Sequence, residues 1–210
     1  MFGIENYLGF IMAAVILNLT PGADTLYILT RSVSQGKNAG LVSVAGIMSG
    51  CIVHVLCAAF GLSMILSTSV MIFTLVKWTG ALYLIYLGLK LVFQKSKAFE
   101  TSPLEETVSD LKKIYKQGVL TNVLNPKVGL FFLSFLPQFI NPDHVNGPMP
   151  FLILGTTFLV TGTLWCLFLT RTAAKMTNTL RHNKIAGALL QKLSGIIFIG
   201  FGLKLAFGKD

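Results

Sequence analysis

The stretch NAGLVSVAGIMSGCIVHVLCAAFGLSMILSTSVMIFTLV, residues 38–76, decides the class of fold because it contains no Asp, Glu, Lys or Arg. A helix needs about 20 consecutive apolar residues to cross a bilayer. The stretch is about twice that long. It therefore predicts two membrane-spanning helices with a turn near Ser67-Thr68-Ser69.

The rest of the chain has the same character. Of its 210 residues, 53% are hydrophobic and 12% are charged, whereas an ordinary soluble domain has about 25% charged residues. The mean hydropathy is +0.72. This pattern predicts an all-α, polytopic membrane protein with six transmembrane helices. The predicted segments are residues 7–29, 41–65, 69–93, 117–140, 150–170 and 187–207.

The net charge of +9 does not indicate a nucleic-acid partner, because the basic residues lie between the apolar segments. The gaps after the first, third and fifth segments hold Arg31, Lys37, Lys95, Lys97, Lys112, Lys113, Lys116, Arg171, Lys175, Arg181 and Lys184. The gaps on the other side and the C-terminal tail hold one lysine, Lys209. Loops rich in Lys and Arg stay in the cytoplasm. We therefore expect both termini to lie outside.

Two pairs of similar stretches suggest an internal repeat. Residues 88–93 (GLKLVF) and 202–207 (GLKLAF) are identical at five of six positions, and the motifs Thr20-Pro21 and Asn125-Pro126 fall in the first segment of each half. Because each half has three spans, the second half must be inverted, as in many secondary transporters. The predicted organisation is a first repeat (1–93), a linker (94–116) and a second repeat (117–210).

The linker is expected to be cytoplasmic and amphipathic. Ser102-Pro103-Leu104-Glu105 resembles a capping box with proline at the first helical position. Apolar residues then recur at helical spacing opposite lysines, which predicts a short helix on the membrane surface that leads into the fourth segment.

The two Pro motifs predict broken helices. Pro21 has no N–H for the carbonyl group of Leu17, so the first segment should break there, with Thr20 as the cap of a new half-helix. Asn125 and Pro126 repeat this pattern in the fourth segment. Exposed N–H groups at the start of a half-helix bind anions, so two such breaks near mid-membrane would suit a substrate carboxylate. Either proline alone could simply kink its helix for packing.

Asp24 and Lys127 are the charges next to these breaks. A charged group at bilayer depth costs at least ~2.5–3.5 kcal/mol, so both should face the interior of the helix bundle and have partners. We expect Asp24 to bind a proton or a substrate ammonium group. Lys127 is expected to be its counter-ion or the partner of a substrate carboxylate. A static Asp24–Lys127 ion pair is the alternative.

The second segment carries three further residues of interest. Gly46 and Gly50 form a G-x-x-x-G step, which favours close helix packing. His54 continues the same face, and it fits either a proton relay or a hydrogen bond to a neighbouring helix.

Other chemistries lack support in the sequence. The sequence contains no P-loop motif, so it does not predict ATP-driven transport, and it implies no cofactor. Cys51, Cys57 and Cys166 lie in apolar segments and are expected to be buried, and Cys51 and Cys57 should point to different sides of one helix. The sequence therefore indicates a carrier and not an enzyme. A metal-ion exporter and a membrane thiol redox carrier stay as alternatives.

The strings NLTPGADTL (18–26) and LNPKVGLFFLSFLPQF (124–139) resemble the LysE/RhtB family of amino-acid exporters, and the similarity covers essentially the whole chain. The resemblance implies efflux of amino acids or close derivatives, such as basic amino acids, threonine, homoserine and its lactone. It also implies the proton motive force as the energy source and a bacterial cytoplasmic membrane. A homo-oligomer is compatible with it.

By resemblance, the first motif contributes Thr20, Pro21, Gly22 and Asp24 to the site, and the second contributes Asn125, Pro126 and Lys127. The chain departs from the family at Ala23, where the family commonly has a second proline. His54 joins these residues as a candidate on its position alone. The expected partners are an amino-acid-like small molecule, protons and the lipid bilayer.

Overall fold

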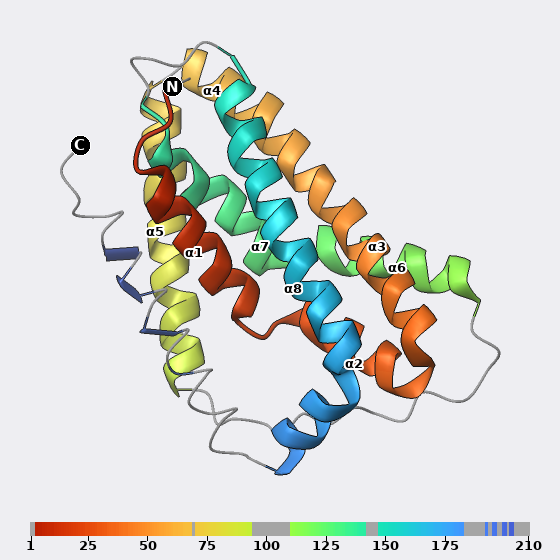
Figure 1. Cartoon of the computed structure of the whole chain (residues 1–210). Helices are drawn as coiled ribbons and strands as arrows, with labels where there is room; N and C mark the ends of the chain where they lie inside the picture. The colour runs from red at the N-terminus through yellow and green to blue at the C-terminus, as the bar shows by residue number, and fades with distance from the viewer. Residues whose placement is uncertain are drawn as a thin grey trace.

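The computed structural model of the chain describes residues 3–68, 70–93, 110–141 and 147–182, together with 192, 195–196, 199–200 and 202–203. These residues are mostly helical, as Figure 1 shows. They contain no β-strand, and their β-type pairing is an isolated antiparallel bridge between Ile4 and Ile140. The all-α prediction is confirmed.

The helices follow one another along the chain with short interruptions. In order they are α1 (Tyr7–Leu19), α2 (Ala23–Ser34), α3 (Gly36–Leu56), the π-helix η1 (Cys57–Leu62), α4 (Ser63–Thr68), α5 (Val70–Phe93), α6 (Leu111–Val123), α7 (Pro126–Leu130), the π-helix η2 (Phe131–Phe135), the 3₁₀ helix η3 (Leu136–Phe139) and α8 (Met149–His182).

Among the described residues, two helical stretches are long and apolar enough to cross a membrane, Gly36–Ile65 and Met149–Ala173. Up to four spans result if each of two bent pairs counts as one: α1 with α2, bent by 50°, and α6 with the helices that follow it, bent by 44°. These four stretches match the first, second, fourth and fifth predicted segments. α5 is the helix expected for the third segment, and most of the sixth, 187–207, lies outside the described residues. Six spans in two inverted repeats, divided at 94–116, stay a prediction.

Two helix boundaries differ from the predicted ones. The expected linker helix from Ser102 lies largely outside the described residues, but α6 already begins at Leu111, where the Asp110 side chain accepts hydrogen bonds from the N–H groups of Lys112 (3.0 Å) and Lys113 (3.3 Å). This N-cap starts a new helix ahead of the predicted segment. α8 continues to His182 because residues 171–182 contain neither glycine nor proline to end it.

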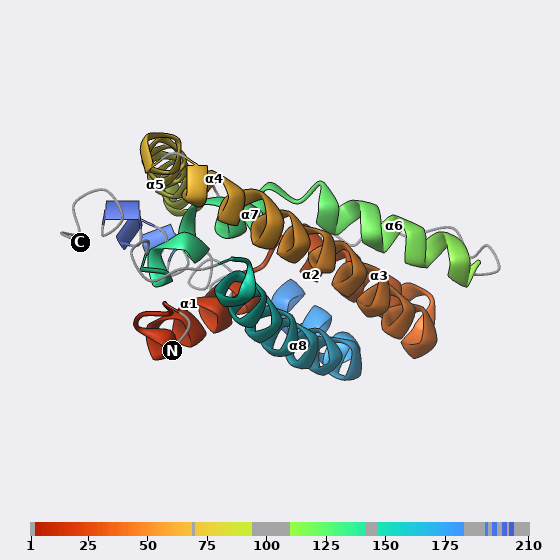
Figure 2. The same ribbon diagram turned by 90° about the horizontal axis from the view of Figure 1, so that it is seen from above.

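α3 is the centre of the packing. It contacts α2, α6 and α8, and Figure 2 shows it between α6 and α8. Its crossing with α6 is close because glycines face each other: a Cβ built on Gly118 would lie 3.2 Å from the Cα of Gly46, and one on Gly50 would lie 2.7 Å from the carbonyl oxygen of Val119. The predicted packing role of Gly46 and Gly50 is confirmed.

Polar side chains tie α2 to α6. The hydroxyl group of Tyr27 donates to the carbonyl oxygen of Ile114 (2.7 Å), and the Arg31 guanidinium group donates to Gln117 Oε1 (2.6 Å). The Arg31 guanidinium group also lies over the Tyr27 ring, 5.4 Å from its centroid. These contacts hold the second half of the first broken helix against the first half of the second.

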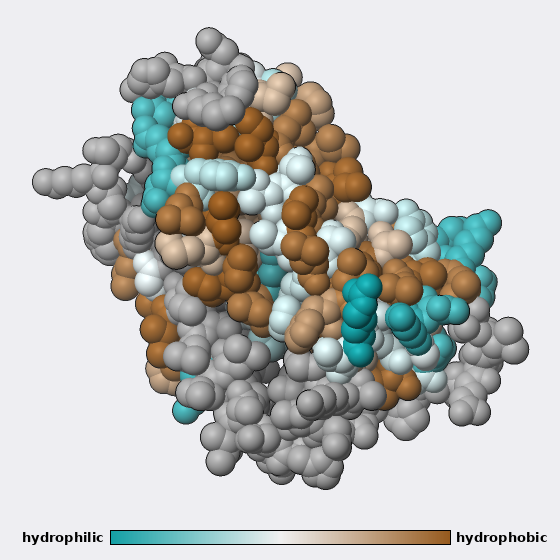
Figure 3. All heavy atoms as spheres, viewed as in Figure 1, coloured by the Kyte–Doolittle hydropathy of each residue, from teal (hydrophilic) through white to brown (hydrophobic). Residues whose placement is uncertain are grey.

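Two buried apolar clusters flank the region where the helices break. The aromatic cluster, as we name it, comprises Phe10, Phe131, Phe132, Phe135, Phe139 and Phe158. The aliphatic cluster comprises Ile28, Leu29, Val44, Ile47 and Leu169. On the outer surface, Figure 3 shows hydrophobic side chains over much of the described part of one face, with hydrophilic ones toward the end of α6 and others at the opposite end, near the start of α1. Such an exterior suits lipid rather than water.

The Gly46–Gly118 crossing predicts a difference between two Gly→Ala substitutions. At Gly46 the new Cβ would overlap the carbonyl oxygen of Tyr115, whereas nothing lies within 4 Å of the Cβ position at Gly61. We expect Gly46→Ala to lower the free energy of unfolding by about 1–3 kcal/mol. Gly61→Ala, which has the same intrinsic gain in helix propensity, should cost nothing. Thermal unfolding in detergent measures both, and equal melting temperatures would contradict the packing argument.

Candidate functional site

The first helix breaks at Thr20-Pro21-Gly22. Thr20 takes an extended conformation (ψ 120°), which the proline after it favours, and its hydroxyl group donates to the carbonyl oxygen of Ile16 (2.8 Å). α2 then begins at Ala23 with Gly22 as its N-cap and with no side-chain cap. The predicted break is confirmed, but Thr20 ends the first half-helix and does not cap the second. The reason is that Pro21 and Gly22 both stay outside the helices.

The second broken helix has the predicted geometry. Asn125 is extended before Pro126 (ψ 107°), and its side chain accepts a hydrogen bond from the N–H of Lys127 at 3.1 Å. Pro126 occupies the first turn of α7. A side-chain N-cap followed by proline is the usual way to start a helix. Asn125 and Pro126 therefore turn the chain by local chemistry alone.

Lys127 joins the two breaks. Its Nζ donates to the carbonyl oxygens of Leu17 (3.3 Å) and Thr20 (2.9 Å) at the C-terminal end of α1. The carbonyl group of Leu17 is the one whose helical donor Pro21 removes. A positive charge is also favourable at a helix C-terminus. Gly22 leaves room for this approach, since a Cβ there would lie 3.1 Å from Nζ.

His54 contacts a backbone carbonyl group at the second break, as Lys127 does at the first. Pro126 cannot supply the i+4 donor to the carbonyl oxygen of Asn122, which accepts instead from the N–H of Asn125 at 2.9 Å, and His54 Nε2 lies 3.0 Å from the same oxygen. Because a carbonyl oxygen only accepts, His54 carries its proton on Nε2 in this contact. The His54 ring also stacks on Phe132, with centroids 6.1 Å apart. Of the two readings of His54, the structure shows the hydrogen bond. A proton relay stays a prediction.

Asp24 is bound by a neighbour that the sequence analysis did not select. The side-chain amide of Asn122 donates to Asp24 Oδ2 at 3.0 Å, while Oδ1 is buried without a hydrogen-bond partner in the protein. Within the described part of the chain no ion pair joins Asp24 to Lys127, because Lys127 Nζ is engaged with backbone carbonyls. The static ion pair is therefore not what holds these two charges.

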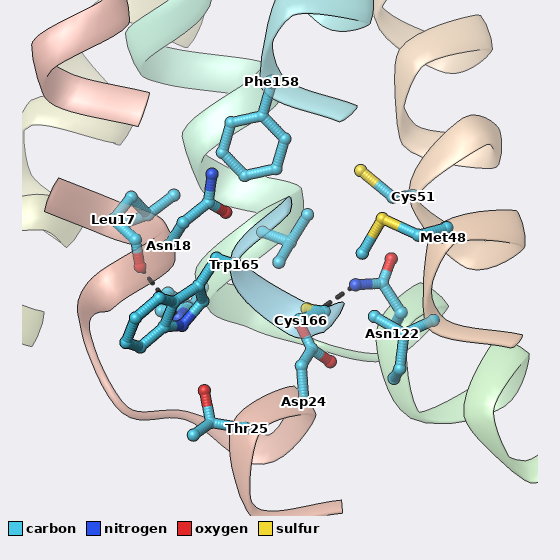
Figure 4. Close-up of a pocket in the computed structure, with 13 residues that line it drawn as sticks. Leu17, Asn18, Asp24, Thr25, Met48, Cys51, Asn122, Phe158, Trp165 and Cys166 are labelled. Atoms are coloured by element: carbon cyan, nitrogen blue, oxygen red, sulfur yellow. Dashed lines mark hydrogen bonds between the residues drawn. The ribbon is translucent and has the colours of Figure 1, made fainter. Parts of the chain in front are cut away.

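Asp24 and Lys127 nevertheless line the same cavity between the breaks (Figure 4). Phe158 lies at one end of the view and Thr25 at the other. The cavity measures about 30 Å³, room for about one or two water molecules. Its lining comprises Leu17, Asn18, Asp24, Thr25, Ile47, Met48, Cys51, Asn122, Lys127, Val128, Phe158, Trp165 and Cys166.

Several buried polar atoms in this region have no hydrogen-bond partner in the protein. Besides Asp24 Oδ1, they include Asn122 Oδ1, Asn125 Nδ2 and Trp165 Nε1. Lys127 has a further ammonium proton, since Nζ carries three donors and makes two hydrogen bonds. Buried polar groups are normally paired, so acceptors and donors left together mark a place built for a polar ligand.

The structure thus brings the eight predicted residues to one region, though not all into the cavity wall. Asp24 and Lys127 line it, Thr20, Pro21 and Gly22 form the break beside it, and Asn125, Pro126 and His54 shape the second break. Among the polar lining residues, the sequence analysis did not select Asn18, Thr25, Asn122 and Trp165. Asn122 had a usable signal: it lies four residues before Pro126 in an apolar segment, where its carbonyl group loses a donor.

The positions of the cysteines and of possible metal-binding side chains bear on the two alternatives, a thiol redox carrier and a metal-ion exporter. Cys51 and Cys166 are buried, as expected, but Cys57 is exposed because it lies on the outer side of its helix. Cys51 and Cys57 therefore do point apart. No group of three or more His, Cys, Asp and Glu side chains that could hold a metal ion occurs among the described residues.

Apolar helices around a small polar cavity at two helix breaks are typical of a multi-pass membrane transport protein. A family model described as LysE type translocator matches residues 15–209. The chain belongs to this family, and the resemblance noted in the two Pro motifs is confirmed.

Individual relatives align over almost the full chain. The uncharacterized membrane protein YrhP of Bacillus subtilis is 34% identical, in an alignment that covers 96% of this chain and 98% of that protein. Leucine efflux proteins of Salmonella choleraesuis and Enterobacter sp. are each 30% identical, covering 98% of this chain and 96% and 97% of their own lengths. No solved structure matches the chain.

The contacts of Lys127 predict a structural effect of its removal. Lys127→Met keeps the approximate length of the side chain but removes two charge-assisted hydrogen bonds to the carbonyl oxygens of Leu17 and Thr20, so we expect a loss of about 1–3 kcal/mol in the free energy of unfolding. Lys116→Met, on the exposed side of α6, is the matched control and should leave stability unchanged. Thermal unfolding in detergent compares them, and a Lys127→Met protein as stable as the control would refute the capping role.

Proposed function

We propose that the protein exports neutral amino acids or their close derivatives from the cytoplasm, driven by the proton motive force. The main support for this proposal is the set of buried polar atoms around the cavity that have no hydrogen-bond partner. Asp24 Oδ1 and Asn122 Oδ1 are acceptors, and Trp165 Nε1 and the remaining ammonium proton of Lys127 are donors. An amino acid presents an ammonium group and a carboxylate a few ångströms apart. The acceptors for the first lie on α2 and α6, and the donors for the second lie on α7 and α8.

The charge balance of the cavity favours a neutral amino acid. Asp24 is the only acidic residue and Lys127 the only basic residue among the described residues that line it. One carboxylate and one ammonium group complement a zwitterion, which has no net charge. A lysine-like substrate would bring a second positive charge without a partner, and burying an unpaired charge is costly. Among the substrates that the family resemblance implies, basic amino acids therefore fit less well. The names of the leucine efflux relatives agree with a neutral substrate.

In the proposed cycle the substrate enters from the cytoplasm and its ammonium group binds Asp24. The half-helices on the other side then open and release it outside. A proton from outside binds the Asp24 carboxylate, which removes the negative charge that would hold the substrate, and the protonated carrier returns. One proton enters for each molecule exported. The His54–Asn122–Asp24 chain of hydrogen bonds would keep the carboxylate in place through these steps.

The orientation in the membrane follows from the distribution of basic residues. The face with α6 carries Lys112, Lys113 and Lys116, which supports a cytoplasmic position for this end and an outside position for both termini. Under this assignment the aliphatic cluster lies on the cytoplasmic side of the cavity and the aromatic cluster on the outer side. The membrane is the bacterial cytoplasmic membrane in this proposal.

Efflux measurements test the proposed function directly. Cells that express the protein are preloaded with radiolabelled amino acids, and we expect leucine or other neutral amino acids to leave faster than from empty-vector cells. A protonophore should abolish the difference, because the gradient supplies the energy. If no amino acid leaves faster than in the empty-vector cells, amino-acid export is wrong. If efflux is faster but insensitive to the protonophore, only the proton coupling fails.

The role of Asp24 is tested by Asp24→Asn. This change keeps the shape and the hydrogen bond to Asn122 but removes the carboxylate, so we expect export to fall to the level of empty-vector cells while membrane insertion is normal. Asp110→Asn is the matched control, because Asn is as good an N-cap as Asp at that exposed position. Efflux rates at equal protein amounts, measured by immunoblot of membranes, compare the two. Normal export by Asp24→Asn would rule out this residue as the coupling site.

A further inference from the structure

A second, larger pocket lies beside the polar cavity, between α1 and α8, and it is open to the outer surface, where Leu164 and Phe168 are exposed. It measures about 390 Å³, and its lining comprises Val15, Asn18, Leu19, Thr161, Leu164, Trp165 and Phe168. A volume of this size falls in the range of small-molecule sites, about 300–1,000 Å³. Most of its lining is aliphatic or aromatic, whereas the small cavity carries the charges.

The two spaces share a wall. Asn18 and Trp165 line both of them, and Figure 4 shows these two side chains next to each other at the edge of the cavity. Asn18 is held from α8, because its amide donates to Thr161 Oγ1 at 3.1 Å. The Trp165 ring stacks on Phe168, with centroids 5.5 Å apart. Asn18 and Trp165 therefore lie between the two spaces, and movement of these two side chains would be needed to join the spaces.

The different volumes of the polar cavity and the adjoining pocket suit different parts of a substrate. Space for about one or two water molecules accommodates the polar groups of an amino acid at most. The side chain of a leucine-sized substrate needs additional, apolar space, and the adjoining pocket supplies it.

Resting on the proposed function, we propose that the pocket between α1 and α8 is the side-chain subsite of the exporter, and that it selects amino acids with medium-sized apolar side chains. The polar groups of the substrate occupy the cavity at Asp24 and Lys127. Its side chain passes between Asn18 and Trp165 and lies against Val15, Leu19 and Leu164. The indole N–H of Trp165, buried without a partner, is then placed at the junction of the two parts and donates to the substrate carboxylate.

Filling the pocket tests this assignment. Val15→Phe places a larger side chain in the pocket, and we expect the ratio of leucine efflux to alanine efflux to fall about tenfold, the usual scale of discrimination by a hydrophobic pocket. Met12→Phe is the matched control, since Met12 is exposed on the same helix and does not line the pocket. Its leucine-to-alanine ratio should equal that of the wild type.

Enlarging the pocket gives an independent readout if Val15→Phe fails to fold. Leu164→Ala removes an exposed side chain from the lining, and we expect phenylalanine efflux to rise relative to leucine efflux by about tenfold. Val160→Ala, an exposed position of α8 outside the lining, is its control. Protein amounts in the membrane are matched by immunoblot for all four variants.

The outcomes separate this inference from the proposed function. If the wild type exports neutral amino acids but neither lining variant changes the selectivity beyond its control, the subsite is wrong and the pocket is a lipid-facing groove. If both lining variants lower all efflux equally, the pocket serves packing and the subsite is again wrong. If the wild type exports no amino acid, the proposed function fails and the subsite falls with it.

Discussion

The interaction on which the site depends is the binding of side chains to backbone carbonyl groups whose i+4 donors are replaced by two prolines. Pro21 removes the i+4 donor of Leu17 and Pro126 that of Asn122, and each carbonyl oxygen accepts instead from the N–H three residues on, that of Thr20 (3.2 Å) and that of Asn125 (2.9 Å). In an apolar environment such groups must be satisfied within the protein. Lys127 and His54 add a second partner to each carbonyl oxygen, and each does so from a helix other than the one that breaks. The two breaks are therefore joined to each other and to α3 by the same bonds that make them tolerable in a membrane.

These hydrogen bonds hold Asp24 and Lys127 in position without an ion pair between them. The ammonium group of Lys127 is stabilised by two carbonyl oxygens at the end of α1, so its burial does not require an ion pair with Asp24. The Asp24 carboxylate is positioned by the amide of Asn122, whose helix is fixed in turn by the glycine crossing with α3. A charge that is positioned but not paired can exchange ligands at low cost. A static pair would first have to be broken.

The sequence predicts the breaks well because proline chemistry is local. Pro21, Asn125 and Pro126 act within a few residues, and the structure has both bends where the motifs stand. The wrong assignment of Thr20 as a cap has a local cause too, since Gly22 delays the start of α2 by two residues. The side chains that bind the carbonyl groups at the two breaks were harder to predict from the sequence. The contacts of Lys127 with α1 and of Asn122 with Asp24 join residues about a hundred positions apart, and only packing decides such pairs.

The unpartnered atoms at the cavity also bear on slippage, the futile cycling of a carrier without cargo. Each buried polar group left without a partner costs about 1–3 kcal/mol. Closure around a zwitterion supplies partners for Asp24 Oδ1, Asn122 Oδ1 and Trp165 Nε1 together, whereas closure around nothing supplies none. In the proposed cycle, the atoms assigned to solute recognition would therefore also penalise the substrate-free passage of an unprotonated carrier. Under that proposal, hydrogen-bond satisfaction at the cavity would by itself favour a tight stoichiometry between solute and proton.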